Sequence, residues 1–122
     1  MTFAVPAEVA FDYLVDPRNR PEWQPSLRAV EVLDDDVAEG QRWVDVTVPG
    51  LRPRMQTTAL RRPTYWEERG QWHGITVRVA LTFTATTTPT GAGCEVEVDC
   101  PRWARRFAES DLRRAARLLG QR

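Results

Sequence analysis

A single histidine, His73, is available for the nucleophilic and metal-dependent chemistries that most hydrolases use. A serine or cysteine triad needs a histidine as its general base, and protein zinc sites usually combine several histidine or cysteine ligands. His73 lies in a Trp-His-Gly stretch with the composition of a turn, where a solvent-facing or locally hydrogen-bonded ring is the simpler interpretation. The sequence also has no P-loop, no GxGxxG fingerprint and no metal-spaced cluster of Cys, His or acidic residues. We therefore expect no metal site, no cofactor and no conventional hydrolytic centre.

The remaining reactive side chains also favour structural roles. Asp34, Asp35 and Asp36 suggest a cation site at first, but the glycine and glutamate of a calcium-binding loop are missing, so a solvated turn is expected. Cys94 and Cys100 are six residues apart in a strand-like segment, which separates them by roughly 20 Å at about 3.3 Å per residue. A disulfide requires Cα atoms within about 7 Å. The two cysteines are therefore expected to be unpaired, small apolar residues in a reducing compartment.

Length and charge set the class of protein. The chain has 122 residues, enough for one domain over residues 1–122, with 42% hydrophobic residues and a formal net charge of zero. We see no basis for nucleic-acid binding, and no apolar run reaches the roughly 20 residues that a membrane-spanning helix needs. Neither end has the pattern of a cleavable signal. We expect a cytoplasmic protein with no membrane insertion, and a homodimer remains possible.

The basic residues are unevenly distributed. All 17 are arginine, and residues 102–122 contain seven of them against Glu109 and Asp111. Two interpretations are open for this last segment. It is either the solvated face of a helix, which is the simpler reading, or a surface that docks an acidic partner.

Helical periodicity marks both ends of the chain. A short strand is expected at residues 2–5, followed by a helix that begins near Pro6 and must end before Pro17. Residues 21–24 allow one more helical turn. A long C-terminal helix follows Pro101, because apolar residues recur there every three or four positions.

Between the helices the periodicity changes to two, which predicts antiparallel strands. The predicted strands cover residues 27–33, 42–48, 54–60, 65–69, 75–88 and 94–100, with a turn at residues 70–74. The element order predicts an α+β fold with two short helices after the first strand and a long helix against one face of a curved sheet.

The segment VPAEVAFDYLVDPRNRPEWQPSLRAVE (residues 5–31) resembles the opening of START-like (SRPBCC) proteins, in particular the bacterial polyketide cyclase/dehydrase and lipid-transport branch. The resemblance lies in the Pro-Ala start of the helix, the Asp-Pro-Arg elbow at 16–18 and the Trp-x-Pro segment at 23–25. It extends to the GxxxxVEV strand at 91–98 and the arginine-rich helix RRFAESDLRRAARLLGQR at 105–122. It implies a helix-grip fold, in which a curved antiparallel sheet wraps around the last helix and leaves a cavity between them.

The resemblance does not imply one activity, because the family includes carriers of apolar molecules and cofactor-free cyclases. Cyclases hold a reactive chain in a shaped cavity and stabilise enolate charge with an aromatic group, a hydroxyl and an arginine. Trp23 matches the aromatic group, and Thr57 falls near the hydroxyl position. Ala59 falls near the arginine position, which weakens the cyclase interpretation. No catalytic residue is therefore assigned.

A largely apolar lining with few charges is instead expected to face the cavity. Its candidate residues are Trp23, Met55, Thr57, Tyr65, Trp66, Trp72, Phe83, Val96 and Phe107. The same side chains could fill a solid core, since pockets and cores have similar linings. Arg78 is expected on the outer face. For strand 42–48, either the Val44-Val46-Val48 row or the Trp43-Asp45-Thr47 row faces in.

Three functions follow from these observations. The first is the binding or transport of a small apolar molecule, lipid or polyketide-like, between the sheet and the last helix. The second is a cofactor-free polyketide cyclase/dehydratase, in which Trp23, Thr57 and Tyr65 orient the substrate. The third is an interaction module that acts through the basic C-terminal helix. A charged residue pointing into the cavity would discriminate between the first two.

Overall fold

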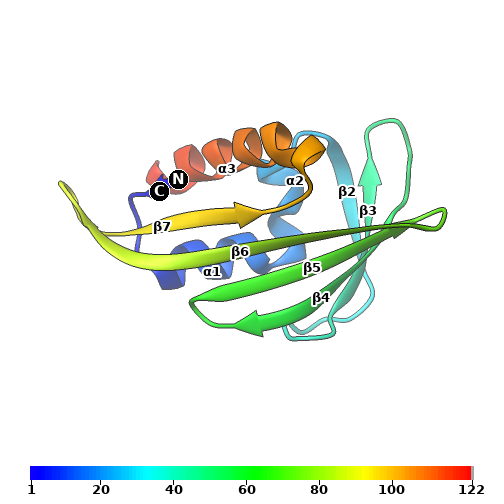
Figure 1. Cartoon of the computed structure of the whole chain (residues 1–122), viewed down its shortest axis with the longest axis horizontal. Helices are drawn as coiled ribbons and strands as arrows, with labels where there is room; N and C mark the ends of the chain where they lie inside the picture. The colour runs from blue at the N-terminus through cyan, green and yellow to red at the C-terminus, as the bar shows by residue number, and fades with distance from the viewer. Residues whose placement is uncertain (122) are drawn as a thin grey trace.

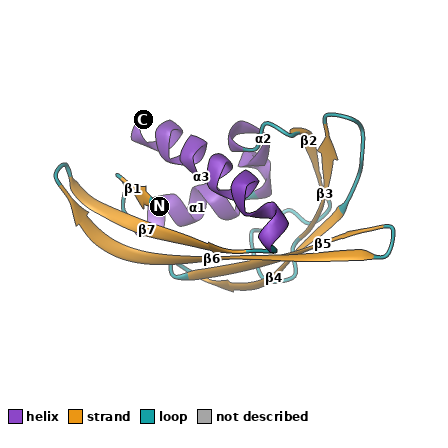
Figure 2. Ribbon diagram, turned by 45° about the horizontal axis from the view of Figure 1, so that its top comes forward, coloured by secondary structure: helices purple, strands orange, loops and turns teal. Residues whose placement is uncertain are grey.

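The computed structural model describes residues 1–121, in which a curved antiparallel sheet carries its helices against the concave face (Figure 1, Figure 2). The sheet has seven strands in the order β1-β7-β6-β5-β4-β3-β2. The strands are β1 (Thr2–Phe3), β2 (Leu27–Val32), β3 (Arg42–Thr47), β4 (Arg54–Arg61), β5 (Tyr65–Trp72), β6 (Ile75–Thr88) and β7 (Gly91–Asp99). The helix-grip arrangement that the sequence predicts is confirmed.

The hairpin between β5 and β6 is longer than the sequence predicts. Gly70 lies within a strand rather than in a turn, and pairing continues to Trp72 opposite Ile75. The connection is made by His73 and Gly74 alone, with φ angles of 47° and 78°. Two residues with positive φ form the tight loop that matches the twist of paired strands, so the strands need not separate earlier.

Helix α1 (Ala7–Val15) follows β1 across a short bend. Its first turn begins after Pro6, whose carbonyl accepts hydrogen bonds from the amides of Val9 and Ala10 at 3.0 and 3.1 Å. Its buried face, which includes Phe11 and Leu14, packs onto β6 and β7. The helix ends at Asp16 because Pro17 disfavours helical geometry in the residue before it.

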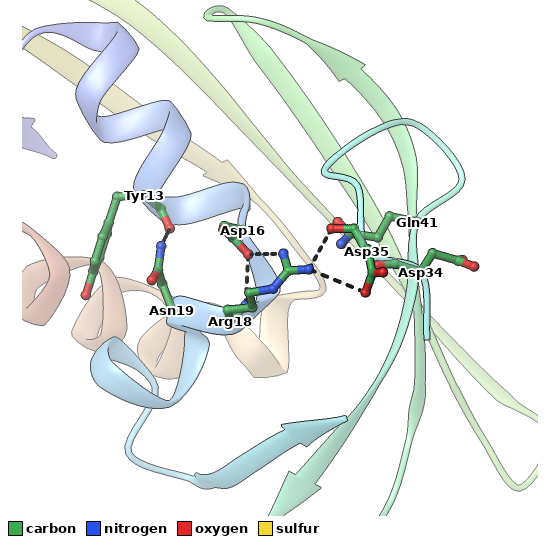
Figure 3. A network of polar contacts seen from close by, with 7 residues as sticks. All are labelled: Tyr13, Asp16, Arg18, Asn19, Asp34, Asp35 and Gln41. Atoms are coloured by element: carbon green, nitrogen blue, oxygen red, sulfur yellow. Dashed lines mark hydrogen bonds and ion pairs between the residues drawn. The ribbon is translucent and has the colours of Figure 1, made fainter. Parts of the chain in front are cut away.

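The elbow after α1 consists of a 3-10 turn, η1 (Pro17–Asn19), and the single helical turn α2 (Arg20–Trp23). Figure 3 shows how it is fixed to its surroundings: Asn19 Nδ2 donates to the Tyr13 carbonyl at 3.0 Å. Arg18 donates to the Asp16 carboxylate at 3.2 Å and to the Asp35 carbonyl at 2.6 Å. The aspartate-rich loop between β2 and β3 therefore closes against the elbow.

Helix α3 (Arg105–Gly120), preceded by the 3-10 turn η2 (Arg102–Ala104), lies across the concave face. Its inward stripe is Leu112, Ala115 and Leu119, all buried. Arg114 Nε donates to the carbonyl of Glu22 at 2.8 Å, which joins α3 to the elbow helix.

The far end of the sheet is not covered by α3. In both ribbon views the tip of the β5–β6 hairpin extends beyond the N-terminal end of α3 (Figure 1, Figure 2). Apolar side chains at this open end are exposed: Trp72 by 39%, Ile75 by 56% and Trp103 by 69%. The concave face therefore changes from a closed core under α1 and α3 to an open groove near the hairpin tip.

Candidate functional site

A buried ion cluster lies where the elbow meets the concave face of the sheet. Arg20 projects from α2 toward Asp45 on β3 and Glu68 on β5, and these residues are only 3%, 4% and 5% exposed. Arg20 donates from Nε and Nη2 to the two Asp45 oxygens at 3.1 and 2.9 Å. Its Nη1 lies 3.1 Å from Glu68 Oε2. Charged side chains are almost never buried without a partner, so the burial of each of these three residues depends on the others.

Within the cluster, Asp45 is fully satisfied. Besides the paired contact with Arg20, it accepts a hydrogen bond from Trp43 Nε1 at 2.9 Å. The Arg20 guanidinium also lies over the Trp43 ring, 5.3 Å from its centroid. Burial by itself would lower the pKa of Arg20, but the charges of Asp45 and Glu68 outweigh it and raise that pKa. Arg20 and Asp45 thus form an ion pair in which both carboxylate oxygens accept hydrogen bonds from the guanidinium.

Glu68 is the carboxyl group of the cluster that Arg20 compensates less completely. Its Oε2 is buried and forms an ion pair with Arg20 Nη1 at 3.1 Å, but this contact lacks the geometry of a hydrogen bond, and no other donor in residues 1–121 bonds to this oxygen. Burial raises the pKa of Glu68 to about 7, against the opposing effect of Arg20 and with a smaller contribution from Asp45. One guanidinium faces two carboxyl groups, so Glu68 is poised to gain or lose a proton near neutral pH.

Glu68 lines a pocket of about 170 Å³ between the sheet and the start of α3. Its walls are mainly hydrocarbon and include Val79, Leu81, Val98, Ala104, Ala108 and Leu112. Asp111 enters from α3, and burial raises its pKa to about 6, partly offset by Arg20. The pocket therefore combines an apolar wall with two carboxyl groups that bind protons more tightly than usual.

Trp23 closes the elbow side of the same pocket. The side chain is 4% exposed, yet its buried Nε1 donates no hydrogen bond within residues 1–121. Trp66 also lines the pocket, but its Nε1 donates to Thr57 Oγ1 at 3.1 Å. The two indoles thus differ: one has a bonded N–H and the other a free one.

A second hollow, of about 390 Å³, continues toward the open end of the sheet. Val77 lines it, whereas Val79 on the same row of β6 lines the first pocket. Its walls are apolar and also include Pro53, Met55, Trp72, Ile75 and Trp103. Met55 packs over Gly70, where an added Cβ would lie only 3.0 Å from its sulfur. The two hollows share no lining residue, and the second one also borders Asp45 of the ion cluster.

The predicted cavity residues lie in four places. Trp23, Trp66 and Phe107 line the first pocket. Met55 and Trp72 line the second hollow. Thr57, Phe83 and Val96 are buried, and Phe83 packs edge-on against Phe11 with ring centroids 5.1 Å apart. Tyr65 lies on the opposite face of the sheet.

The position of Tyr65 follows from strand parity, because Trp66 and Glu68 of the same strand face inward. Its hydroxyl donates to Glu67 at 3.1 Å and accepts from Arg78 at 3.0 Å. The prediction that Arg78 faces outward is confirmed, and the hydroxyl of Tyr65 belongs to this outer network. Thr57 is committed to Trp66 as its hydrogen-bond acceptor.

Phe107 lies at the rim of the pocket and is 73% exposed. It is five positions before Leu112, which at 3.6 residues per turn places it well off the inward stripe of α3. Ala108, four positions before Leu112, takes the inward place. This leaves room for the pocket, which a phenyl ring pointing inward would occupy.

The charged residues of the site were missed by sequence reasoning. A lining with few charges was expected, but Arg20, Asp45, Glu68 and Asp111 all face the interior. Of the two open rows in β3, the one with Trp43 and Asp45 faces the cavity. Glu68 follows Trp66 by two positions in the same strand, so its inward orientation could have been inferred from the sequence. The partner that allows its burial, Arg20, comes from the elbow.

Three further findings concern metal binding, the cysteines and the helices. No cluster of three or more His, Cys, Asp or Glu suited to a metal ion occurs in residues 1–121. Both cysteines are free, as predicted. None of the helices in residues 1–121 is long and apolar enough to cross a membrane.

Comparison with known proteins gives one family. A family model described as polyketide cyclase / dehydrase and lipid transport matches residues 1–121. No curated protein matches the sequence.

Solved structures show the same fold at low identity. Protein DR_A0006 from Deinococcus radiodurans is 23% identical, with a TM-score of 0.66 over 96% of this chain and 91% of its own. Protein MLL2253 from Mesorhizobium loti is 21% identical, with a TM-score of 0.67 over 99% of this chain and 95% of its own. Ara h 8.0201 is 13% identical, with a TM-score of 0.69 over the full chain and 95% of its own.

Proposed function

Because the chain belongs to the polyketide cyclase / dehydrase and lipid transport family of START-like proteins, we propose that it binds or carries a small, largely apolar molecule. The site is the pocket between the sheet and α3. The observation that carries this proposal is the pocket itself: hydrocarbon walls around a space of about 170 Å³ that ends at Glu68 and Trp23.

The size of the pocket supports a small ligand or one end of a larger one. An apolar cavity of about 150 Å³ holds a benzene-sized molecule. A longer chain has room to continue into the second hollow, which is lined by Met55, Trp72 and Trp103. Burial of each CH₂ group there contributes about 0.8 kcal/mol to binding.

The test uses toluene as a probe and one substitution that fills the pocket. Ala108→Trp places an indole in the space opposite Val79 and Leu81, whereas Ser110→Trp places the same group on the exposed side of α3. Saturable toluene binding to the wild-type protein and to Ser110→Trp, but not to Ala108→Trp, is the expected result. Absence of binding to the wild-type protein would refute the proposal.

A second candidate is a cofactor-free cyclase or dehydratase, and one observation favours it. Two carboxyl groups with raised pKa values, about 7 for Glu68 and about 6 for Asp111, line the same pocket. Such a pair supplies an acid and a base near neutral pH. In a dehydration, the base would remove the proton next to a ketone while the acid protonates the departing hydroxyl, giving an enone and water.

In this candidate the reacting groups are Glu68 and Asp111, not the Thr57 and Tyr65 of the sequence-based hypothesis. A β-hydroxy ketone of pocket size, such as 4-hydroxybutan-2-one, tests it through the absorbance of the enone product. Loss of turnover in both Glu68→Gln and Asp111→Asn, with Tyr65→Phe unchanged, is the expected result. A wild-type rate equal to the buffer rate for β-hydroxy ketones would dismiss the candidate and leave the binding proposal intact.

A further inference from the structure

Two side chains that line the pocket each carry a buried polar atom with no hydrogen-bond partner within residues 1–121: Trp23 Nε1, a donor, and Glu68 Oε2. Both side chains line the same small space and both are at least nine-tenths buried. Leaving a buried polar group unsatisfied costs about 1–3 kcal/mol, so such atoms are rare in native folds and each calls for a physical explanation.

The rest of the cluster cannot satisfy them. Asp45 takes the two well-aligned donors of Arg20 and the indole N–H of Trp43. Arg20 therefore offers Glu68 only the ion-pair contact through Nη1. The nearby indole of Trp66 donates to Thr57 and is not available to Glu68. The N–H of Trp23 and the carboxyl oxygen of Glu68, which has only its ion-pair contact, thus both have hydrogen-bonding capacity left for a ligand.

We propose that the ligand of this pocket carries a hydroxyl group at its buried end, which accepts a hydrogen bond from Trp23 Nε1 and donates one to Glu68. The ligand is then a phenol or an alcohol whose hydrocarbon part contacts Val79, Leu81 and Leu112. This inference rests on the proposed binding function and specifies its ligand class.

Other polar head groups fit less well. A ligand carboxylate would face the carboxyl groups of Glu68 and Asp111, and repulsion would exclude it. An ammonium group would pair with the carboxylates but has no lone pair for the indole N–H of Trp23. An ether or ketone oxygen accepts from Trp23, but it can also bond to Glu68 only while Glu68 is protonated. A hydroxyl both donates and accepts, so among these groups it satisfies both atoms whether Glu68 is ionised or protonated.

The experiment compares ring-matched probes: p-cresol, which has a hydroxyl group, 4-methylanisole, which only accepts, and toluene, which has neither. Affinities are measured by calorimetry or by NMR titration of the wild-type protein. We expect p-cresol to bind at least about tenfold more tightly than toluene, because two hydrogen bonds are added, one of them to a charged group. 4-Methylanisole should fall between the two.

The chain offers a matched pair of variants. Trp23→Phe removes the free N–H and keeps an aromatic ring, so it should reduce the preference for p-cresol over toluene. Tyr65→Phe removes a hydroxyl on the opposite face of the sheet, away from the pocket, so it should leave this preference unchanged. A third readout uses the wild-type protein, with Trp23→Phe serving only to assign the indole N–H resonance of Trp23. This resonance should move downfield with p-cresol and not with toluene.

The outcomes separate this inference from the proposed function. Equal binding of p-cresol and toluene, or a Trp23 resonance that does not respond to p-cresol, would overturn the hydroxyl assignment while ligand binding stands. Tighter binding of 4-methylbenzylamine than of p-cresol would replace it with an amine. If no probe binds, both proposals fail.

Discussion

The pH dependence of stability tests whether the buried charge of Glu68 is incompletely compensated by Arg20. Burial raises its pKa from an ordinary value of 4.5 to about 7. Between these two values the folded chain holds a proton that the unfolded chain has released, so the free energy of unfolding falls as the pH rises. The stabilisation that the raised pKa of Glu68 gives the folded chain is fully present below about pH 4.5 and lost as the pH rises through about 7. From the two pKa values, the loss between pH 5 and pH 8 is about 2–3 kcal/mol.

Glu68→Gln removes this titration and keeps the shape of the side chain. The difference in unfolding free energy between the variant and the wild-type protein should therefore move by about 2–3 kcal/mol in favour of the variant from pH 5 to pH 8. Urea unfolding followed by circular dichroism at several pH values measures this difference. Titrating groups that do not interact with Glu68 are common to both proteins and cancel in the comparison.

Glu67 provides the control, because it is the neighbour of Glu68 on the outer face of the same strand. Hydrogen bonds from Thr58 and then Arg78 lower the pKa of Glu67, so its contribution is lost only when the pH falls below its ordinary range. Glu67→Gln should show no change in its difference from the wild-type protein between pH 5 and pH 8. Parallel curves for Glu68→Gln and wild type would refute the assignment of Glu68 as a buried, under-compensated carboxyl group.

Three further predictions concern the frame around the site. Arg20→Met leaves two buried carboxyl groups without their cation and should lower the free energy of unfolding, measured in urea, by about 3–5 kcal/mol. A loss no larger than that of Arg62→Met, which breaks an exposed ion pair, would contradict this prediction. Thr57→Val removes the acceptor of the buried Trp66 N–H and should cost about 1–3 kcal/mol, with Thr57→Ser close to wild type; an unchanged melting midpoint in the valine variant would show that this bond is dispensable. Gly93→Ala places a Cβ only 2.7 Å from a backbone oxygen of β1 and should release that strand, seen as faster amide exchange in residues 2–3; unchanged exchange would show that the backbone adapts.

The helix-grip fold could be predicted because its signals are local. Alternation in residues 75–88 and helical spacing in residues 105–120 each identify an element without knowledge of its neighbours. The boundary of β5 was harder, since Gly70 suggests a turn and only the conformation of His73 and Gly74 shows that the strands stay paired.

The polar part of the site could not be predicted for a different reason. Arg20, Asp45 and Glu68 come from an elbow helix and two strands, at separations of 25 and 23 residues along the chain. Each of these residues taken alone reads as an exposed charge. Their burial becomes favourable only when all three meet, and periodicity carries no information about which segments meet. The free N–H of Trp23 is likewise visible only when the partners of every neighbouring donor are known.

Methyl-resolved NMR of the wild-type protein titrated with toluene tests the central claim most directly. The account predicts saturable shifts confined to methyl groups that line the pocket, those of Val79, Leu81, Val98 and Leu112, with no response from the exposed Val48 on the far edge of the sheet. An absence of saturable shifts, or shifts centred on residues outside the pocket, would contradict it.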